Sequence, residues 1–220
     1  MKIISLSSSI AGPACAVAKS IKKYFYNNNY QTNMFDYLEI SFLSILQILY
    51  LDKDDINYLN LNNEIFLNKN GNNSVKFNNF DKIISHHDLI QKYSQNNYND
   101  FIEKYKRRYY RLINDIENED KIFFIRYGIE DNEIINKFID KILIINPLLK
   151  VYFIIVDYNE NNEKINNKNY IYINFYNHEN IKYNNDLYYR TIEYNWKIVY
   201  DIIFKNLNVS EQKIFKYYDY

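Results

Sequence analysis

One cysteine is the strongest candidate for covalent chemistry in this sequence. Cys15 follows the turn-like run Ala11-Gly12-Pro13-Ala14, and apolar residues at helical spacing come after it. Proline suits a turn or a first helical position, so Cys15 is predicted to lie at or near the N-terminus of a helix that follows a strand. There the positive end of the helix dipole favours the thiolate, the nucleophilic form. A structural role is the alternative, because a lone cysteine among alanine and valine is commonly a small buried apolar residue.

Three histidines supply the candidate bases. His86 and His87 precede Asp88, and His178 lies further along the chain. A histidine beside a carboxylate can act as an oriented base, or both can contribute to a metal site. Adjacent residues point in different directions, so at most one of His86 and His87 is predicted to face a given site. Because the chain has one cysteine and no other histidine-rich cluster, we predict no metal site and no cofactor.

The elements that must position these groups alternate between apolar strands and amphipathic helices. Predicted strands are 2–9, 80–85, 121–126, 151–156 and 170–175; predicted helices are 15–26, 38–51, 101–116, 132–145 and 189–207. Residues 52–79 are Asn-rich and are predicted to be loops around a weak strand at 64–67. The pattern predicts a single α/β domain over residues 1–220. We expect a three-layer sandwich with a mainly parallel sheet of about four to six strands flanked by helices.

The predicted sheet brings reactive groups to one edge. In open α/β sheets, ligands lie outside the carboxyl ends of the strands. Cys15, Arg126, Asp157 and His178 each follow a predicted strand. A thiol, a guanidinium, a carboxylate and an imidazole would therefore converge there. No glycine-rich phosphate loop of either standard spacing is present, so a nucleotide P-loop and a dinucleotide fingerprint are not supported.

Composition excludes several classes of protein. The 27 basic and 27 acidic side chains cancel, so we predict no nucleic-acid partner and no attraction to an anionic membrane. With 47% hydrophobic residues and only 3 Gly and 2 Pro, the chain can bury a core and is not a disordered or collagen-like sequence. A single cysteine excludes an internal disulfide framework. The longest apolar stretch, 42–51, is about half the roughly 20 residues of a membrane span, so we expect no membrane span and a cytoplasmic location.

A set of short motifs points to a known family. They are Gly12-x-x-Cys15-x-x-Ala18, Phe35-Asp36-Tyr37, His87-Asp88, Lys104-Tyr105-x-Arg107-Arg108 and Phe124-Ile125-Arg126. In order and spacing they resemble the motifs of a family of uncharacterised proteins described as papain-like cysteine peptidases. The sequence departs from that family at residues 10–11, at Met34 and at Tyr37, where the family has Ser-Leu, Pro and Trp. These departures affect packing more than chemistry.

The resemblance implies a cysteine-dependent hydrolase of a peptide, isopeptide or other acyl bond. Cys15 would be the nucleophile, His87 the base, and Asp36 or Asp88 the carboxylate that orients it. His86 and His178 are reserve bases. An imidazole within about 4 Å of the Cys15 sulfur would support this hypothesis.

The alternative is a non-proteolytic Rossmann-like module in which Cys15 is structural. It would be glycosyltransferase-like or would bind a small anionic ligand, with Arg126, Arg107 and Asp157 at the strand edge. Arg107 also belongs to a basic stripe at 104–111, which is more often a solvated helix face. The substrate and the oligomeric state are left open by the sequence.

Overall fold

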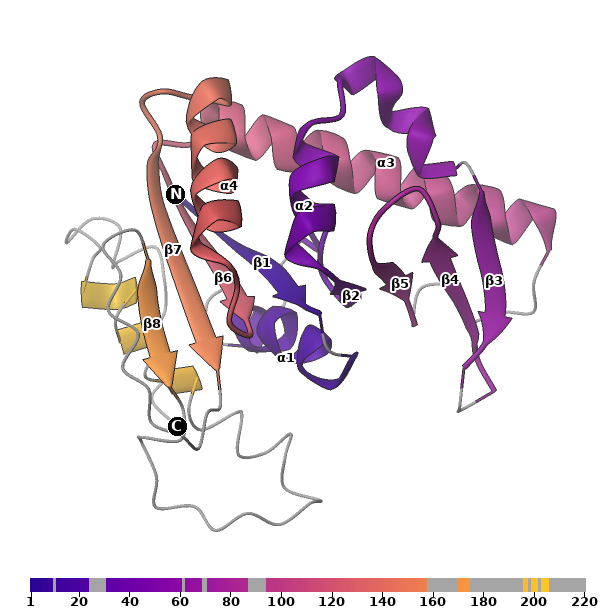
Figure 1. The fold of residues 1–220 in the computed structure, drawn as a ribbon, viewed down its shortest axis with the longest axis horizontal. Coiled ribbons are helices and arrows are strands. Elements are labelled where there is room, and N and C mark those ends of the chain that lie inside the picture. The colour runs from indigo at the N-terminus through magenta and orange to yellow at the C-terminus, as the bar shows by residue number, and fades with distance from the viewer. Residues whose placement is uncertain are drawn as a thin grey trace, which may run out of the picture.

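Among the residues that the structure describes, eight strands form one sheet in the order β3-β4-β5-β2-β1-β6-β7-β8 (Figure 1). The computed structural model describes residues 1–9, 11–23, 31–60, 62–68, 71–86, 94–157, 170–174, 196–197, 199–201 and 203–205. The strands are β1 Lys2–Ser8, β2 Leu38–Ile40, β3 Asn63–Leu67, β4 Asn73–Phe77, β5 Ile83–Ser85, β6 Lys121–Tyr127, β7 Lys150–Asp157 and β8 Ile171–Asn174. The helices are α1 Ala11–Ile21, α2 Phe42–Leu49, α3 Gln95–Asn118 and α4 Asn132–Ile145, with a 3-10 helix, η2, at Lys53–Asn60.

The sheet has a parallel part and an antiparallel part. Strands β2, β1, β6, β7 and β8 are paired in parallel, whereas β5, β4 and β3 extend the β2 edge as antiparallel neighbours. The α/β class is therefore confirmed, but the prediction of a mainly parallel sheet of four to six strands is wrong. The physical reason is that β3, β4 and β5 follow one another through short connections, which join antiparallel strands without a helical crossover.

Side chains on the two faces of the sheet belong to separate hydrophobic clusters. Ile4, Leu6 and Phe124 pack with α2, α3 and α4 on one face. Ile3 and Phe123, one residue away in each strand, pack with α1 and with helical residues of the C-terminal region, including Trp196, on the other. Neighbouring residues of a strand point to opposite faces, so continuous apolar strands fill both cores.

The long helix α3 links the two parts of the sheet. It runs from the β3–β5 end toward α4 (Figure 1), and its Phe101 and Tyr105 rings lie 5.8 and 5.6 Å from the ring of Phe77 in β4. Ser94 caps the helix, because its side chain accepts a hydrogen bond from the Asn97 backbone N–H. The antiparallel strands are thus part of the same core as the parallel ones.

Two sequence predictions fail between residues 38 and 79. The predicted helix at 38–51 is a strand, β2, followed by α2, because Ser41 accepts from the Ser44 N–H and starts the helix there. Residues 52–79 were predicted as loops around a weak strand at 64–67; that strand is confirmed as β3, but η2 and β4 were not predicted. Asparagine is depleted in strands, so composition hid β4, which is held by pairing with β3 and by Val75 and Phe77 in the core.

Candidate functional site at the carboxyl edge of the sheet

The connections that leave the parallel strands change sides of the sheet between β1 and β6. Counted among the parallel strands alone, the sheet has the doubly wound order 2-1-3-4-5. From β1 the chain passes to α1 on one face, and from β6 it passes to α4 on the other. The two connections therefore diverge at this edge, which is where α/β sheets of this order bind ligands. Gly128, directly after β6, has a φ of +103°, and no atom lies within 4 Å of the position a Cβ would take, so the backbone at this edge is unobstructed.

Arg126 lies fully buried beneath this edge and ties three strands together. Its Nη1 donates to the Leu6 carbonyl at 2.7 Å and its Nη2 to the Ile40 carbonyl at 2.8 Å. Nε and Nη2 also donate to Glu130 Oε1, at 2.8 and 2.6 Å. Burial lowers the pKa of Arg126, while the Glu130 carboxylate opposes that shift. Arg126 therefore holds a carboxylate of its own chain, Glu130, and its role toward an external anion stays a prediction.

A hydrogen-bonded network of polar side chains lies on the α1 face of the sheet beside this edge, and its members are Lys82, Glu39, His86 and Ser74. Lys82 Nζ donates to the Ser9 carbonyl at 2.9 Å and pairs with Glu39 Oε1 at 2.6 Å. Glu39 Oε2 lies 3.0 Å from His86 Nε2, and His86 Nδ1 lies 3.2 Å from Ser74 Oγ. With the proton on Nε2, His86 donates to Glu39 and accepts from Ser74. This network extends from the end of β1, past β5 and β2, to β4.

Glu39 lies at the centre of this network and is held ionised. Partial burial alone would raise its pKa, but hydrogen bonds and charges from Lys82 and His86 outweigh burial and lower it. Lys82 retains an exposed side chain, at 41% of its full accessibility, against 13% for Glu39. Lys82 is therefore the member of this network that offers a positive charge to solvent, and its ammonium lies beside the start of α1.

Cys15 lies in the second turn of α1 and is 9% exposed. Ala16, Val17 and Ile21 of the same helix face the sheet. Cys15 is buried as well, but it is not among the residues of the hydrophobic cluster on this face. Both ring nitrogens of His86 have partners, Glu39 and Ser74.

Asp36 is buried in the turn before β2. Its carboxylate accepts from the Asn33 backbone N–H at 2.8 Å and from Asn33 Nδ2 at 2.9 Å, while Asn33 Oδ1 accepts from the Phe35 N–H at 2.9 Å. These bonds stabilise the turn that leads into β2.

The other predicted site residues are dispersed or lie outside the described residues. Arg107 is exposed on α3, and Asp157 ends β7 opposite Asn174 of β8. His87, Asp88 and His178 lie outside the residues that the structure describes. The elements that carry Cys15, Arg126 and Asp157 meet at this edge of the sheet, but the side chains of Cys15 and Arg126 are buried.

Sequence reasoning missed Glu39, Lys82 and Ser74. The alternation of Leu38, Glu39 and Ile40 was the available indication, since it favours a strand with one polar face. Their assembly depends on pairing between strands far apart in the chain, which no local pattern reveals.

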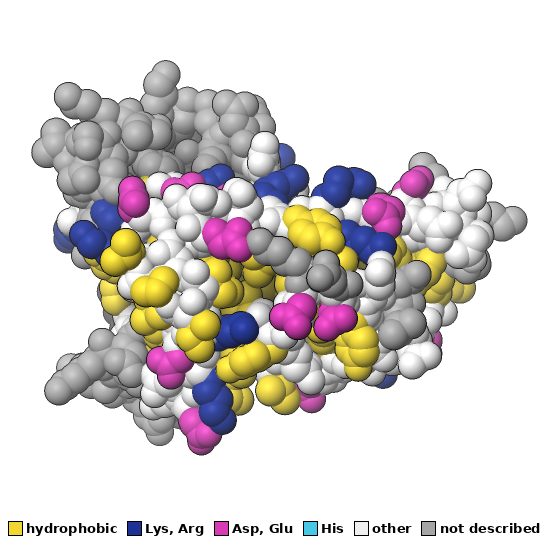
Figure 2. Space-filling model, turned by 90° about the horizontal axis from the view of Figure 1, so that it is seen from above, with side chains coloured by type: hydrophobic (Ala, Val, Ile, Leu, Met, Phe, Trp, Pro, Cys, Tyr) yellow, Lys and Arg dark blue, Asp and Glu magenta, His cyan; other side chains and the backbone are white. Residues whose placement is uncertain are grey.

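Neither the surface charge nor comparison with known proteins points to a particular ligand. Within the described ranges, no group of three histidine, cysteine or acidic residues could hold a metal ion, and no helix is long and apolar enough to cross a membrane. The surface seen from above the view of Figure 1 mixes acidic, basic and hydrophobic side chains without a single-sign patch (Figure 2).

Comparison of the chain with protein-family models, curated proteins and solved structures gives no significant match.

Proposed function

We propose that this protein binds a small anionic molecule outside the carboxyl end of β1, where α1 begins. The observation that carries the proposal is the divergence of the chain at β1 and β6 in a doubly wound order, which is the position of ligand sites in such sheets. The anion would lie against the N-terminus of α1, whose first backbone N–H groups lack helical partners.

Lys82 supports the anionic character of this ligand. An ammonium group has three N–H donors, and the Ser9 carbonyl and Glu39 occupy two of them. The third is left for a ligand. The Lys82 side chain is 41% exposed, and its ammonium is bound to Ser9, two residues before α1 begins. A phosphate or carboxylate would gain a charge-assisted hydrogen bond from Lys82 together with the helix dipole.

Titration calorimetry with inorganic phosphate, ribose 5-phosphate and AMP tests the proposal, with ribose and adenosine as uncharged counterparts. We expect the phosphorylated compounds alone to bind, and Lys82→Gln to weaken their binding at least about tenfold, the equivalent of one charge-assisted hydrogen bond. Lys106→Gln is the matched control, because Lys106 makes a similar 2.8 Å pair with Glu103 on α3. Equal binding of charged and uncharged compounds, or equal losses in both variants, would refute the proposal.

A cysteine-dependent hydrolase is the second candidate. It is favoured by the position of Cys15 in the N-terminal half of a helix that follows a central strand, where the dipole favours a thiolate. The motif resemblance supports His87 as its base, with His178 in reserve. The two candidates differ in one measurement: the rate at which iodoacetamide labels Cys15 near neutral pH. A rate well above that of a model thiol supports the hydrolase, whereas a slower rate supports a packing role.

A further inference from the structure

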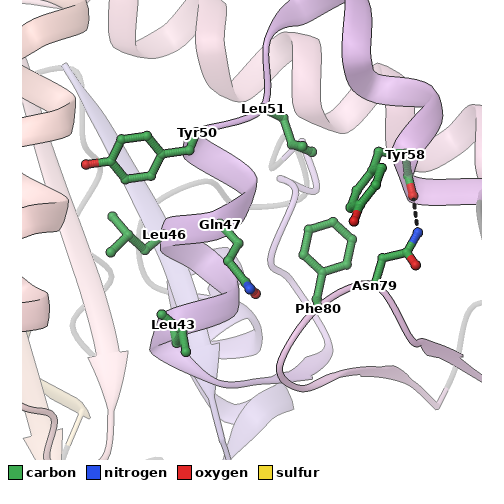
Figure 3. Close-up of a pocket in the computed structure, with 8 residues that line it drawn as sticks. All are labelled: Leu43, Leu46, Gln47, Tyr50, Leu51, Tyr58, Asn79 and Phe80. Carbon is green, nitrogen blue, oxygen red and sulfur yellow. Dashed lines mark hydrogen bonds between the residues drawn. The ribbon is translucent and has the colours of Figure 1, made fainter.

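An open pocket lies on the opposite face of the sheet from Lys82 and Glu39. It is a cavity of about 340 Å³ between α2, η2 and the turn that joins β4 to β5 (Figure 3). One wall is the α2 stripe Leu43, Leu46, Gln47 and Tyr50, at helical spacing. The other wall is formed by Leu51, Tyr58, Asn79 and Phe80.

The pocket exists because α2 is apolar on more than one side. Phe42, Ile45 and Leu49 face the core, while Leu43 on the outer side is 42% exposed. Tyr50 does not cover the opening, because its ring is held by α4, where Lys141 Nζ lies 4.6 Å from the ring centroid. On the other wall, the rings of Tyr58 and Phe80 meet edge to face with centroids 6.0 Å apart, which fixes an aromatic surface.

Two polar groups on opposite walls define what the pocket can recognise. Gln47 Oε1 accepts from the Asp81 backbone N–H at 3.1 Å, which orients the amide and leaves its NH₂ group without a hydrogen bond among the described residues. The Tyr58 hydroxyl also has none among them, whereas Asn79 donates to the Tyr58 carbonyl at 3.1 Å and holds that residue in place (Figure 3). None of the eight lining residues is charged.

We propose that this pocket binds a neutral, planar aromatic molecule that carries a carbonyl acceptor. Its ring would pack between the α2 leucines and the Tyr58–Phe80 surface, and its carbonyl would accept from Gln47 and Tyr58. An apolar cleft with a few fixed polar groups and a volume near the lower end of small-ligand sites, roughly 300–1,000 Å³, fits such a compound. A charged ligand would lose hydration without gaining an ionic partner. The site is independent of the anion site, from which the sheet separates it.

The probe is 2-quinolinone, with naphthalene and quinoline-2-carboxylate as the compounds that lack the carbonyl or add a charge. Binding is followed by chemical-shift changes of backbone amides in the full chain. We expect saturable binding of 2-quinolinone, tighter than either comparison compound, with shifts around α2 and residues 79–80. Tyr58→Ala should weaken it at least tenfold, and Gln47→Leu should abolish the preference over naphthalene.

Tyr110→Ala is the matched control. Tyr110 is 45% exposed against 43% for Tyr58, and it makes a similar edge contact with Tyr109, but it does not line the pocket. We expect it to change binding less than twofold. Leu43→Gln, at an exposed position of the wall, provides a second test if Tyr58→Ala does not fold. The absence of saturable binding up to the solubility limit, shifts located elsewhere, or equal effects of the Tyr58 and Tyr110 variants would overturn the proposal.

Discussion

Replacement of Arg126 by methionine should be among the most destabilising changes in this protein. The substitution keeps most of the apolar stem but removes all four hydrogen bonds to Leu6, Ile40 and Glu130. Removing one partner of a buried ion pair costs about 3–5 kcal/mol, and each carbonyl left without a donor costs about 1–3 kcal/mol. These effects overlap, so we expect a loss of about 5–8 kcal/mol in the free energy of unfolding. A loss of that size approaches the whole stability of a typical domain, about 5–15 kcal/mol.

The assay is urea unfolding followed by the fluorescence of Trp196, the only tryptophan, which is fully buried. Arg111→Met is the control. Arg111 also donates to a backbone carbonyl, that of Thr32, at 2.7 Å, but among the described residues it makes one such bond where Arg126 makes two. It should cost about 1 kcal/mol. A double-mutant cycle with Glu130→Gln should give a coupling energy of at least about 2 kcal/mol.

Arg126→Lys extends the test, since one ammonium cannot reach two carbonyls and a carboxylate in the way a planar guanidinium does. We expect it to lose at least half of the stability that Arg126→Met loses. If Arg126→Met destabilises the protein no more than Arg111→Met does, the three-strand tie is not a major source of stability and the reasoning fails.

Three further predictions concern pH and the first strand. The pKa of Glu39 is lowered by Lys82 and His86, so its contribution to stability is present above the unfolded pKa of about 4.5 and is lost as pH falls through the folded pKa. Glu39→Gln should therefore reduce the loss of unfolding free energy as pH falls below 4.5. Burial and nearby acidic groups raise the pKa of Tyr109 to about 12, so the stability it contributes is full below pH 10 and is lost as pH rises toward 12; Tyr109→Phe should remove that loss in alkaline urea titrations. Deletion of residues 1–18 removes β1, which lies between β2 and β6, and should leave no cooperative thermal melt, whereas Cys15→Ala should melt within a few degrees of the original protein.

Prediction from the sequence succeeded where one local pattern dominates. Helix α4 matches its predicted bounds, 132–145, and β1, β6, β7 and β8 were each predicted within a residue or two at either end. These segments are either continuous apolar runs of strand length or carry strong helical spacing. The run at 38–51 misled because a three-residue strand and a helix, both apolar, follow one another with only Ser41 between them.

The candidate site was less predictable because long-range pairing builds it. Glu39 meets Lys82 and His86 only because β2 pairs with β5, more than 40 residues later. Arg126 was predicted at the correct edge, yet its burial depends on carbonyl groups from two other strands. Cys15 was placed correctly on its helix, but the side of the helix it occupies follows from how α1 packs, which the spacing of so short a segment does not determine.

The central position of β1 also has a consequence for how the chain folds during synthesis. Lys2 of β1 pairs with Ile122 of β6, so the partner strand is made 120 residues later. At about 5–20 residues per second, this interval is roughly 6–24 seconds. During that time the only neighbouring strand available to β1, which is almost entirely buried in the folded protein, is β2, through the pairing of Ser8 with Glu39. Closing so long a loop is slow, so the nascent N-terminal strand is the segment of this protein for which a chaperone would have the longest access.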